Sequence, residues 1–172
     1  CTRVSHLMFL ITGFYASLLA IYCIRLIARV VGNRVGNKIS IGDGTLNIVG
    51  EMIKKDSRDG KVPKEALKQY SGLQKSIRSH GNFVETVPLF LILLALFEAS
   101  REGSVFPKLA VHICGGLFVV ARVLHADFGM MGARGQGFGR VIGMLTTLLC
   151  ILFLAGANIY LAVQAGIFEE LL

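Results

Sequence analysis

The sequence lacks the cysteine patterns of a metal site or a disulfide framework. Its four cysteines include no CxxC pair and no Cys/His spacing that would suit zinc. Three of them, Cys23, Cys114 and Cys150, lie inside apolar stretches, where a single thiol usually packs as a small hydrophobic group. We therefore expect no bound metal.

Polar residues are missing from long parts of the chain, which excludes an ordinary soluble domain. Hydrophobic residues make up 53% of the 172 residues, and the mean hydropathy is +0.63. In a soluble helix or strand they would alternate with polar residues at a regular spacing. Here they form four blocks instead, at residues 7–24, 86–97, 109–121 and 141–168. A spanning helix needs about 20 mostly apolar residues, a length that the second and third blocks reach only by including Glu85 and Arg122. The sequence therefore predicts an all-α integral membrane protein, a four-helix bundle.

The first block is a retained helix rather than a secretory signal. It is longer than the apolar core of a typical signal peptide, lacks a small-residue cleavage pattern and continues directly into Arg25 and Arg29. We expect a single membrane domain over residues 1–172. Its helices are expected at about residues 6–31, 64–99, 106–128 and 140–165, with a loop at residues 32–63.

Basic residues outnumber acidic ones, 18 to 11, and they gather on one side of the predicted membrane. Nine of them lie between residues 32 and 77, and the connection after the third block adds Arg134 and Arg140. The positive-inside rule then places both loops in the cytoplasm and both termini outside, in a bacterial inner membrane or in the endoplasmic reticulum of a eukaryote. Topology and anionic lipid head groups explain this basicity, so we expect no nucleic-acid partner. The dense mixed charge at residues 51–61 indicates a solvated loop without regular structure.

The most unusual stretch carries polar side chains into the start of the second apolar block. At about 100° per residue, Arg78, Asn82 and Glu85 share one face of a helix, while His80 points elsewhere. An ionisable group at the edge of a membrane segment is costly unless it is paired, and therefore indicates a functional site. The alternative is a structural clamp between helices, in which Glu85 meets an arginine of a neighbouring helix.

Further polar residues are expected at the same depth on other helices. Arg122 and His125 lie three residues apart on one side of the third helix, Asp127 points away from both, and Arg140 begins the fourth helix. The basic side chains can bind the carboxylates of a ligand, and the acidic side chain can bind its ammonium group. Such a site suits a small, peptide-like zwitterion. An apolar groove between the helices would suit a hydrophobic co-substrate.

Residues 129–143 contain six glycines around Arg134 and Arg140. The phosphate-binding pattern GxxxxGK[ST] is absent, so we expect a flexible connection between helices. Gly139 and Gly143 also fit the small-xxx-small pattern of close helix contacts.

The pattern Arg78-x-His80-x-Asn82-x-x-Glu85-x-x-Pro88 resembles the second-helix signature of the MAPEG family, the membrane-associated proteins in eicosanoid and glutathione metabolism. The segment 41–44, Ile-Gly-Asp-Gly, and the pair Arg122-x-x-His125 add to the likeness, which covers nearly the whole chain. The resemblance implies a homotrimer that binds glutathione between adjacent subunits near the cytoplasmic face.

The resemblance also implies roles for individual residues. By analogy, Arg78, Asn82 and Glu85 would hold the glutathione backbone, with Glu85 taking its amino group. The other residues implied in glutathione binding are Arg34, Arg122 and His125. Arg140 would stabilise the glutathione thiolate, with Arg134 as the second candidate, because a guanidinium lowers the pKa of a nearby thiol. The chain departs from related patterns at Gly81, where an arginine occurs in prostaglandin-synthase-like members, and at Gly129 and Met144, where tyrosines are usual.

Two functions follow from the resemblance. The first is a glutathione transferase or peroxidase that acts on hydrophobic substrates from the bilayer. The second is a non-catalytic lipid- or ligand-binding scaffold, which the missing tyrosines favour, so the question of catalysis stays open. A transporter has less support, because one acidic residue lies within the predicted membrane segments and no inverted repeat is visible.

Overall fold

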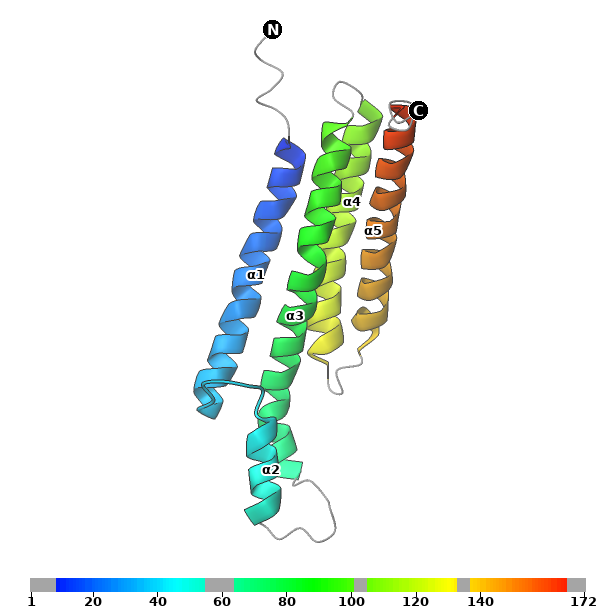
Figure 1. Ribbon diagram of the computed structural model, residues 1–172. Coiled ribbons are helices and arrows are strands. Elements are labelled where there is room, and N and C mark those ends of the chain that lie inside the picture. Colours follow the sequence, from blue (N-terminus) through cyan, green and yellow to red (C-terminus); the bar gives the residue numbers. More distant parts are fainter. Residues whose placement is uncertain (1–8, 55–63, 101–104, 133–136, 167–172) are drawn as a thin grey trace.

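A computed structural model describes residues 9–54, 64–100, 105–132 and 137–166. The four long helices are α1 (Leu10–Asn37), α3 (Lys64–Ala99), α4 (Val105–Val123) and α5 (Phe138–Gln164). A short helix, α2 (Thr45–Lys54), lies between α1 and α3, and a π-helix, η1 (Leu124–Met130), continues α4 (Figure 1). The described residues contain no strand.

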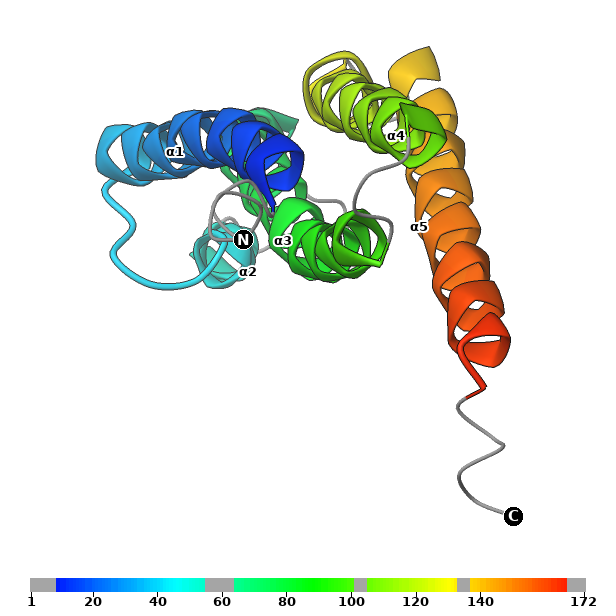
Figure 2. The same ribbon diagram turned by 90° about the horizontal axis from the view of Figure 1, so that it is seen from above.

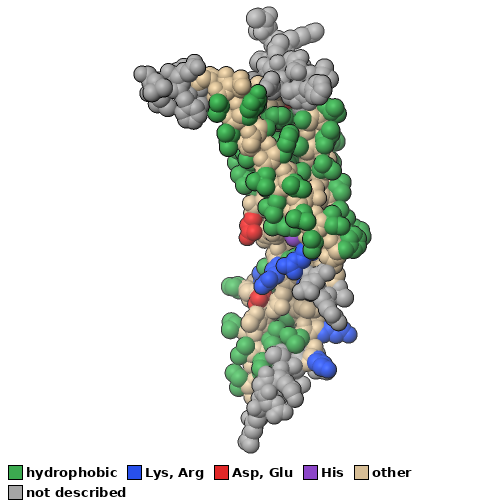
Figure 3. Space-filling model, turned by 90° about the vertical axis from the view of Figure 1, so that its right-hand side faces the viewer, with side chains coloured by type: hydrophobic (Ala, Val, Ile, Leu, Met, Phe, Trp, Pro, Cys, Tyr) green, Lys and Arg blue, Asp and Glu red, His purple; other side chains and the backbone are tan. Residues whose placement is uncertain are grey.

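The long helices confirm the predicted all-α membrane bundle. Four segments, at residues 10–37, 67–99, 108–130 and 138–164, are long and apolar enough to cross a membrane. Only 22–44% of the apolar window of each segment is buried within the protomer, so most of its surface is left for lipid or other chains. On the face seen in Figure 3, hydrophobic side chains cover the upper part, and the charged side chains of the described residues lie lower down. Viewed from above, α5 crosses the other helices at an angle (Figure 2).

Aromatic and leucine side chains fill the centre of the bundle. Phe90 of α3 and Phe118 of α4 are fully buried and stack with their ring centroids 3.6 Å apart. Leu19 of α1, Leu94 of α3 and Leu154 of α5 pack in the same cluster. All four long helices therefore share one core.

An acidic side chain of α3 caps the start of α1. The Glu98 carboxylate accepts hydrogen bonds from the backbone N–H groups of Ile11 (3.0 Å) and Thr12 (2.8 Å). The first N–H groups of a helix have no partner within it, and their partial positive charge favours an anion. Glu98 thus fixes one end of α1 against α3.

Helix α2 is the main departure from the sequence prediction, which expected no regular structure between residues 32 and 63. Ile48 of α2 packs with Tyr70 and Leu73 of α3, so a helix here buries an apolar stripe. The many charged residues of the segment hid this stripe in the sequence. Hydrogen bonds from Thr45, through its side chain and its backbone N–H, lower the pKa of Asp43, which precedes the helix. Helix α1 also runs further than expected, to Asn37. Residues 55–63 lie outside the described part of the chain.

The glycines at the start of α5 allow its backbone to touch the end of the preceding helix. A Cβ atom at Gly143 would lie 2.5 Å from the carbonyl oxygen of Ala121 and 2.7 Å from the backbone nitrogen of His125. A Cβ atom at Gly139 would overlap the carbonyl oxygen of Leu124. The small-residue pair that the sequence indicated is therefore a close contact between α5 and the α4–η1 segment.

Two glycines of α5 give a matched test of this contact. We expect Gly143→Ala to destabilise the protein by about 1–3 kcal/mol, because backbone atoms block the new methyl group. Gly156→Ala should leave stability unchanged or raise it by up to about 1 kcal/mol, because nothing lies within 4 Å of its Cβ position. Thermal unfolding of both variants in detergent measures the difference, and equal melting temperatures would contradict the contact.

Candidate functional site

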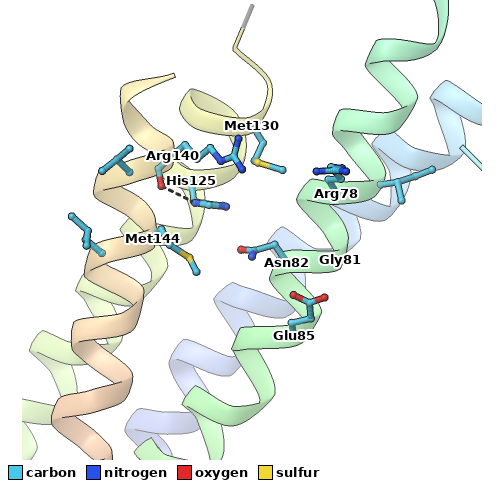
Figure 4. A pocket seen from close by; sticks show the side chains of 11 residues that line it. Arg78, Gly81, Asn82, Glu85, His125, Met130, Arg140 and Met144 are labelled. Atoms are coloured by element: carbon cyan, nitrogen blue, oxygen red, sulfur yellow. Dashed lines mark hydrogen bonds between the residues drawn. The ribbon is translucent and has the colours of Figure 1, made fainter. Parts of the chain in front are cut away.

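A cleft of about 650 Å³ opens between α3 on one side and η1 and α5 on the other. Its polar lining consists of Arg78, Asn82, Glu85, His125 and Arg140 (Figure 4). Its apolar lining consists of Ile77, Met130, Val141, Met144 and Leu145. The cleft thus joins charged groups of both signs to an apolar wall.

The α3 wall has the polar face that the helical spacing predicted. Arg78, Asn82 and Glu85 all line the cleft, with Gly81 between them. Arg78 and Glu85 are exposed, and Asn82 is half-buried. Glu85 forms no ion pair within the described part of the protomer, so no arginine of this chain clamps it there.

Arg122 lies behind the cleft rather than in it. Its side chain is 2% exposed, and its Nη1 donates hydrogen bonds to Asn82 Oδ1 (2.8 Å) and Thr86 Oγ1 (3.0 Å). The Thr86 hydroxyl in turn donates to the backbone carbonyl of Asn82 (2.9 Å). Because Asn82 Oδ1 is the acceptor, its Nδ2 group is left as the hydrogen-bond donor for the cleft. Arg122 therefore orients a cleft residue instead of contacting a ligand itself.

Two donor atoms of Arg122, Nε and Nη2, are buried without a hydrogen-bond partner among the described residues. The guanidinium carbon lies 5.8 Å from the centre of the Phe118 ring, a distance that permits a cation–π contact. A buried guanidinium without a carboxylate is costly. Its position therefore depends strongly on Asn82 and Thr86.

His125 joins η1 to α5. Its ring is 5% exposed, and Nδ1 lies 3.0 Å from the backbone carbonyl oxygen of Arg140. The residue belongs to a π-helix, a rare geometry that often marks functional sites. Arg140 lines the cleft with its exposed side chain, so one residue contributes both a guanidinium to the cleft and a carbonyl to the histidine.

Two departures from the family pattern have structural counterparts. Gly129 lies against the backbone of Arg140, and a Cβ at this position would lie 2.5 Å from the Arg140 Cα. A tyrosine at residue 129 would therefore displace α5. Met144 lines the cleft, so a thioether stands where the resemblance led us to expect a hydroxyl.

One predicted site residue, Arg34, is not brought to the cleft of this protomer. Arg34 lies near the end of α1, where its Nη1 donates to the carbonyl oxygen of Ser40 (3.1 Å). Arg134, the second candidate for the thiolate contact, lies outside the described residues. Among the described residues, no three His, Cys, Asp or Glu side chains gather closely enough to hold a metal ion.

Sequence reasoning missed the cluster that ties α1 to η1. Asp127 Oδ2 accepts from Arg25 Nη1 (2.5 Å) and from the Tyr22 hydroxyl (3.1 Å), and Oδ1 accepts from Arg29 Nη2 (2.7 Å). The available signal was the spacing of Tyr22, Arg25 and Arg29, which places them on one face of α1. Asp127 was correctly placed away from the cleft, but its partners were not found.

A second, apolar hollow of about 360 Å³ lies between α4 and α5. It is lined by Ala110, Ile113, Cys114, Leu117, Thr146, Leu149, Cys150 and Phe153. Both cysteines are free, as expected from their apolar surroundings.

The sequence itself matches a known family. The model of the MAPEG family matches residues 12–160. The chain belongs to the MAPEG family. This membership confirms the resemblance drawn from the pattern between Arg78 and Pro88.

Two bacterial relatives of this MAPEG protein carry the name inner membrane protein YecN, one from Escherichia coli K12 and one from Escherichia coli O6:H1. Each is 26% identical over 152 residues, which cover 88% of this chain and 92% of the relative. No solved structure matches. Together with the four apolar helices, these relatives identify the chain as a multi-pass membrane protein.

Asp127 offers a test of the cluster between α1 and η1. Asp127→Asn removes the negative charge that Arg25 and Arg29 share, and we expect a loss of about 1–3 kcal/mol in the free energy of unfolding. Lys68→Gln is the control, because Lys68 is an exposed charged residue near the start of α3 and forms no ion pair with a described residue. Thermal unfolding in detergent at low and high salt gives the comparison. An Asp127→Asn variant as stable as the control would show that the cluster contributes nothing.

Proposed function

We propose that this MAPEG protein binds glutathione in the cleft between α3 and α5 and uses it as a co-substrate for reactions with hydrophobic molecules. The observation that supports this most directly is the placement of Glu85 opposite Arg140, with Arg78 beside it, around a cleft of about 650 Å³. Glutathione carries two carboxylates, one ammonium and one thiol. Arg78 suits one of its carboxylates, Arg140 suits its thiolate, and Glu85 suits its ammonium.

The amide groups of glutathione also find a suitable partner. Asn82 Nδ2 is free to donate because Arg122 occupies Oδ1. A peptide carbonyl of the ligand is the natural acceptor for this group. The buried Arg122 thus supports binding from behind the cleft.

The protein is expected to work as a homotrimer. Arg34 lies away from the cleft of its own protomer, and most of the surface of each apolar segment is exposed. In a trimer with sites between subunits, Arg34 of an adjacent copy would supply a further cation for a glutathione carboxylate.

In the catalytic version of this function, the Arg140 guanidinium stabilises the thiolate as it forms. The thiolate then attacks an electrophilic carbon and displaces its leaving group, which gives a glutathione conjugate. Alternatively it attacks a peroxide oxygen and breaks the O–O bond, which releases an alcohol and oxidises the glutathione to its sulfenic acid. Preorganised cations in a water-poor site stabilise such charge more strongly than water does. The apolar wall at Val141, Met144 and Leu145 would hold the second substrate.

A non-catalytic ligand-binding scaffold is the second candidate. It is favoured by Gly129 and Met144, because neither provides the hydroxyl group of a tyrosine. Such a protein would bind glutathione or a lipid in the same cleft without turnover.

Binding is tested by ligand-induced thermal shifts of the purified protein in detergent. Glutathione at about 100 times its Kd should stabilise the wild type by about 2.7 kcal/mol. The shift should fall strongly in Glu85→Gln, which loses the partner of the ammonium. It should stay unchanged in Lys68→Ala, which alters an exposed residue outside the cleft. A sulfur-free analogue, γ-glutamyl-alanyl-glycine, should give a smaller shift than glutathione. If neither peptide stabilises the wild type, the proposed function is wrong.

Turnover separates the enzyme from the scaffold. With a hydrophobic electrophile or a lipid peroxide as second substrate, Arg140→Ala should lower kcat on the order of 10²-fold, because the charge on sulfur loses its partner. Lys68→Ala, which removes an exposed cation of α3 outside the cleft, is the matched control. Glutathione binding without measurable turnover in the wild type would favour the scaffold.

A further inference from the structure

The geometry points to His125 as the group that accepts the proton of the glutathione thiol, a role that rests on the glutathione site proposed above. Arg140 can stabilise a thiolate, but a guanidinium has no free electron pair and cannot take the proton. A separate proton acceptor at the cleft therefore promotes thiolate formation, and the lining supplies one.

The hydrogen bond to Arg140 fixes the position of the proton on the imidazole ring. His125 Nδ1 lies 3.0 Å from a backbone carbonyl oxygen, which can only accept a hydrogen bond. Nδ1 therefore carries the hydrogen. In the neutral ring, Nε2 then holds an unshared electron pair.

This electron pair is available to the cleft. In Figure 4 the His125 ring extends from the Arg140 carbonyl into the space between α5 and α3. Nε2 has no hydrogen-bond partner within the described residues. The ring is buried, and its bond to the Arg140 carbonyl holds it in this orientation.

Several charged groups face the ring from the surrounding helices. They are Arg78 and Glu85 from α3, Arg122 from α4 and Arg140 from α5. Asp127 of η1 and its partners on α1, Arg25 and Arg29, point the other way. Glu85 is the other possible acceptor among the polar lining residues, but the proposed site uses it for the ammonium. A carboxylic acid is also ordinarily a stronger acid than an imidazolium, so imidazole is the better acceptor for a thiol proton.

The step balances without any other reactant. The S–H bond breaks, its electron pair stays on sulfur, and the proton bonds to His125 Nε2. The products are a thiolate beside the Arg140 guanidinium and an imidazolium that still donates through Nδ1 to the Arg140 carbonyl. When the thiolate reduces a peroxide, the same proton is placed to protonate the departing oxygen.

The test compares thiolate formation with ligand binding in three variants. His125→Asn keeps an amide donor near the Nδ1 position but removes the Nε2 acceptor, and His125→Gln serves if the first variant unfolds. His112→Asn is the matched control, because His112 lies on α4, the helix that η1 continues, but contacts Tyr15 rather than the cleft. The near-ultraviolet absorbance of bound glutathione, titrated with pH, measures the thiolate. Calorimetry with S-methylglutathione, which has no thiol proton, measures binding.

We expect thiolate formation in His125→Asn to need a pH about one unit higher than in the wild type. On the rising part of the titration, this shift corresponds to about tenfold less thiolate at a given pH. Affinity for S-methylglutathione should fall by much less than thiolate formation does, and His112→Asn should match the wild type in both measurements. If His125→Asn and His125→Gln titrate like the wild type, His125 is not the acceptor, while the glutathione site stands. If both variants lose S-methylglutathione binding, His125 is a binding residue and the proposal is wrong. If the wild type binds neither ligand, the proposed function fails as well.

Discussion

The close approach of two backbones, η1 and the start of α5, is the constraint on which the site depends. Glycines 139 and 143 allow it, because any side chain there would collide with backbone atoms. The approach brings the carbonyl of Arg140 to the ring of His125 while the Arg140 side chain reaches the cleft. A segment that looks flexible by composition therefore has its glycines packed against the end of the preceding helix, and this contact positions one wall of the cleft.

The π-helical turn is held from both sides. On the side away from the cleft, Asp127 binds two arginines and a tyrosine of α1, and on the other side His125 meets α5. Two residues that lie two positions apart on one short helix thus point to opposite neighbours. Helix α1 is fixed at its other end by Glu98, so two acidic groups of other helices hold it in place.

The sequence predicted the membrane helices and the polar face of α3 well, because both follow from local rules. Span length is set by the bilayer, and the common face of Arg78, Asn82 and Glu85 is set by the helical repeat. The depth of Arg122 could not be derived in this way, because whether a side chain points into the cleft or behind it depends on packing between helices. The same holds for the Asp127 partners, which lie about 100 residues earlier. Helix α2 was missed because its apolar stripe indicates a helix only once it is seen to pack against α3. The position of Arg34 relative to a second subunit stays a prediction.

The α5 wall of the cleft has a consequence for how molecules reach it. Val141 is 62% exposed and Leu145 is 55% exposed, and both lie on a helix that is apolar enough to cross a membrane. A compound dissolved among lipid tails meets this wall sideways, without passing through water. Its supply is then governed by its partition coefficient instead of its aqueous concentration. Since each methylene group contributes about 0.8 kcal/mol to that transfer, two additional carbons enrich a compound at the wall by on the order of tenfold, even if the protein itself does not distinguish the two chain lengths.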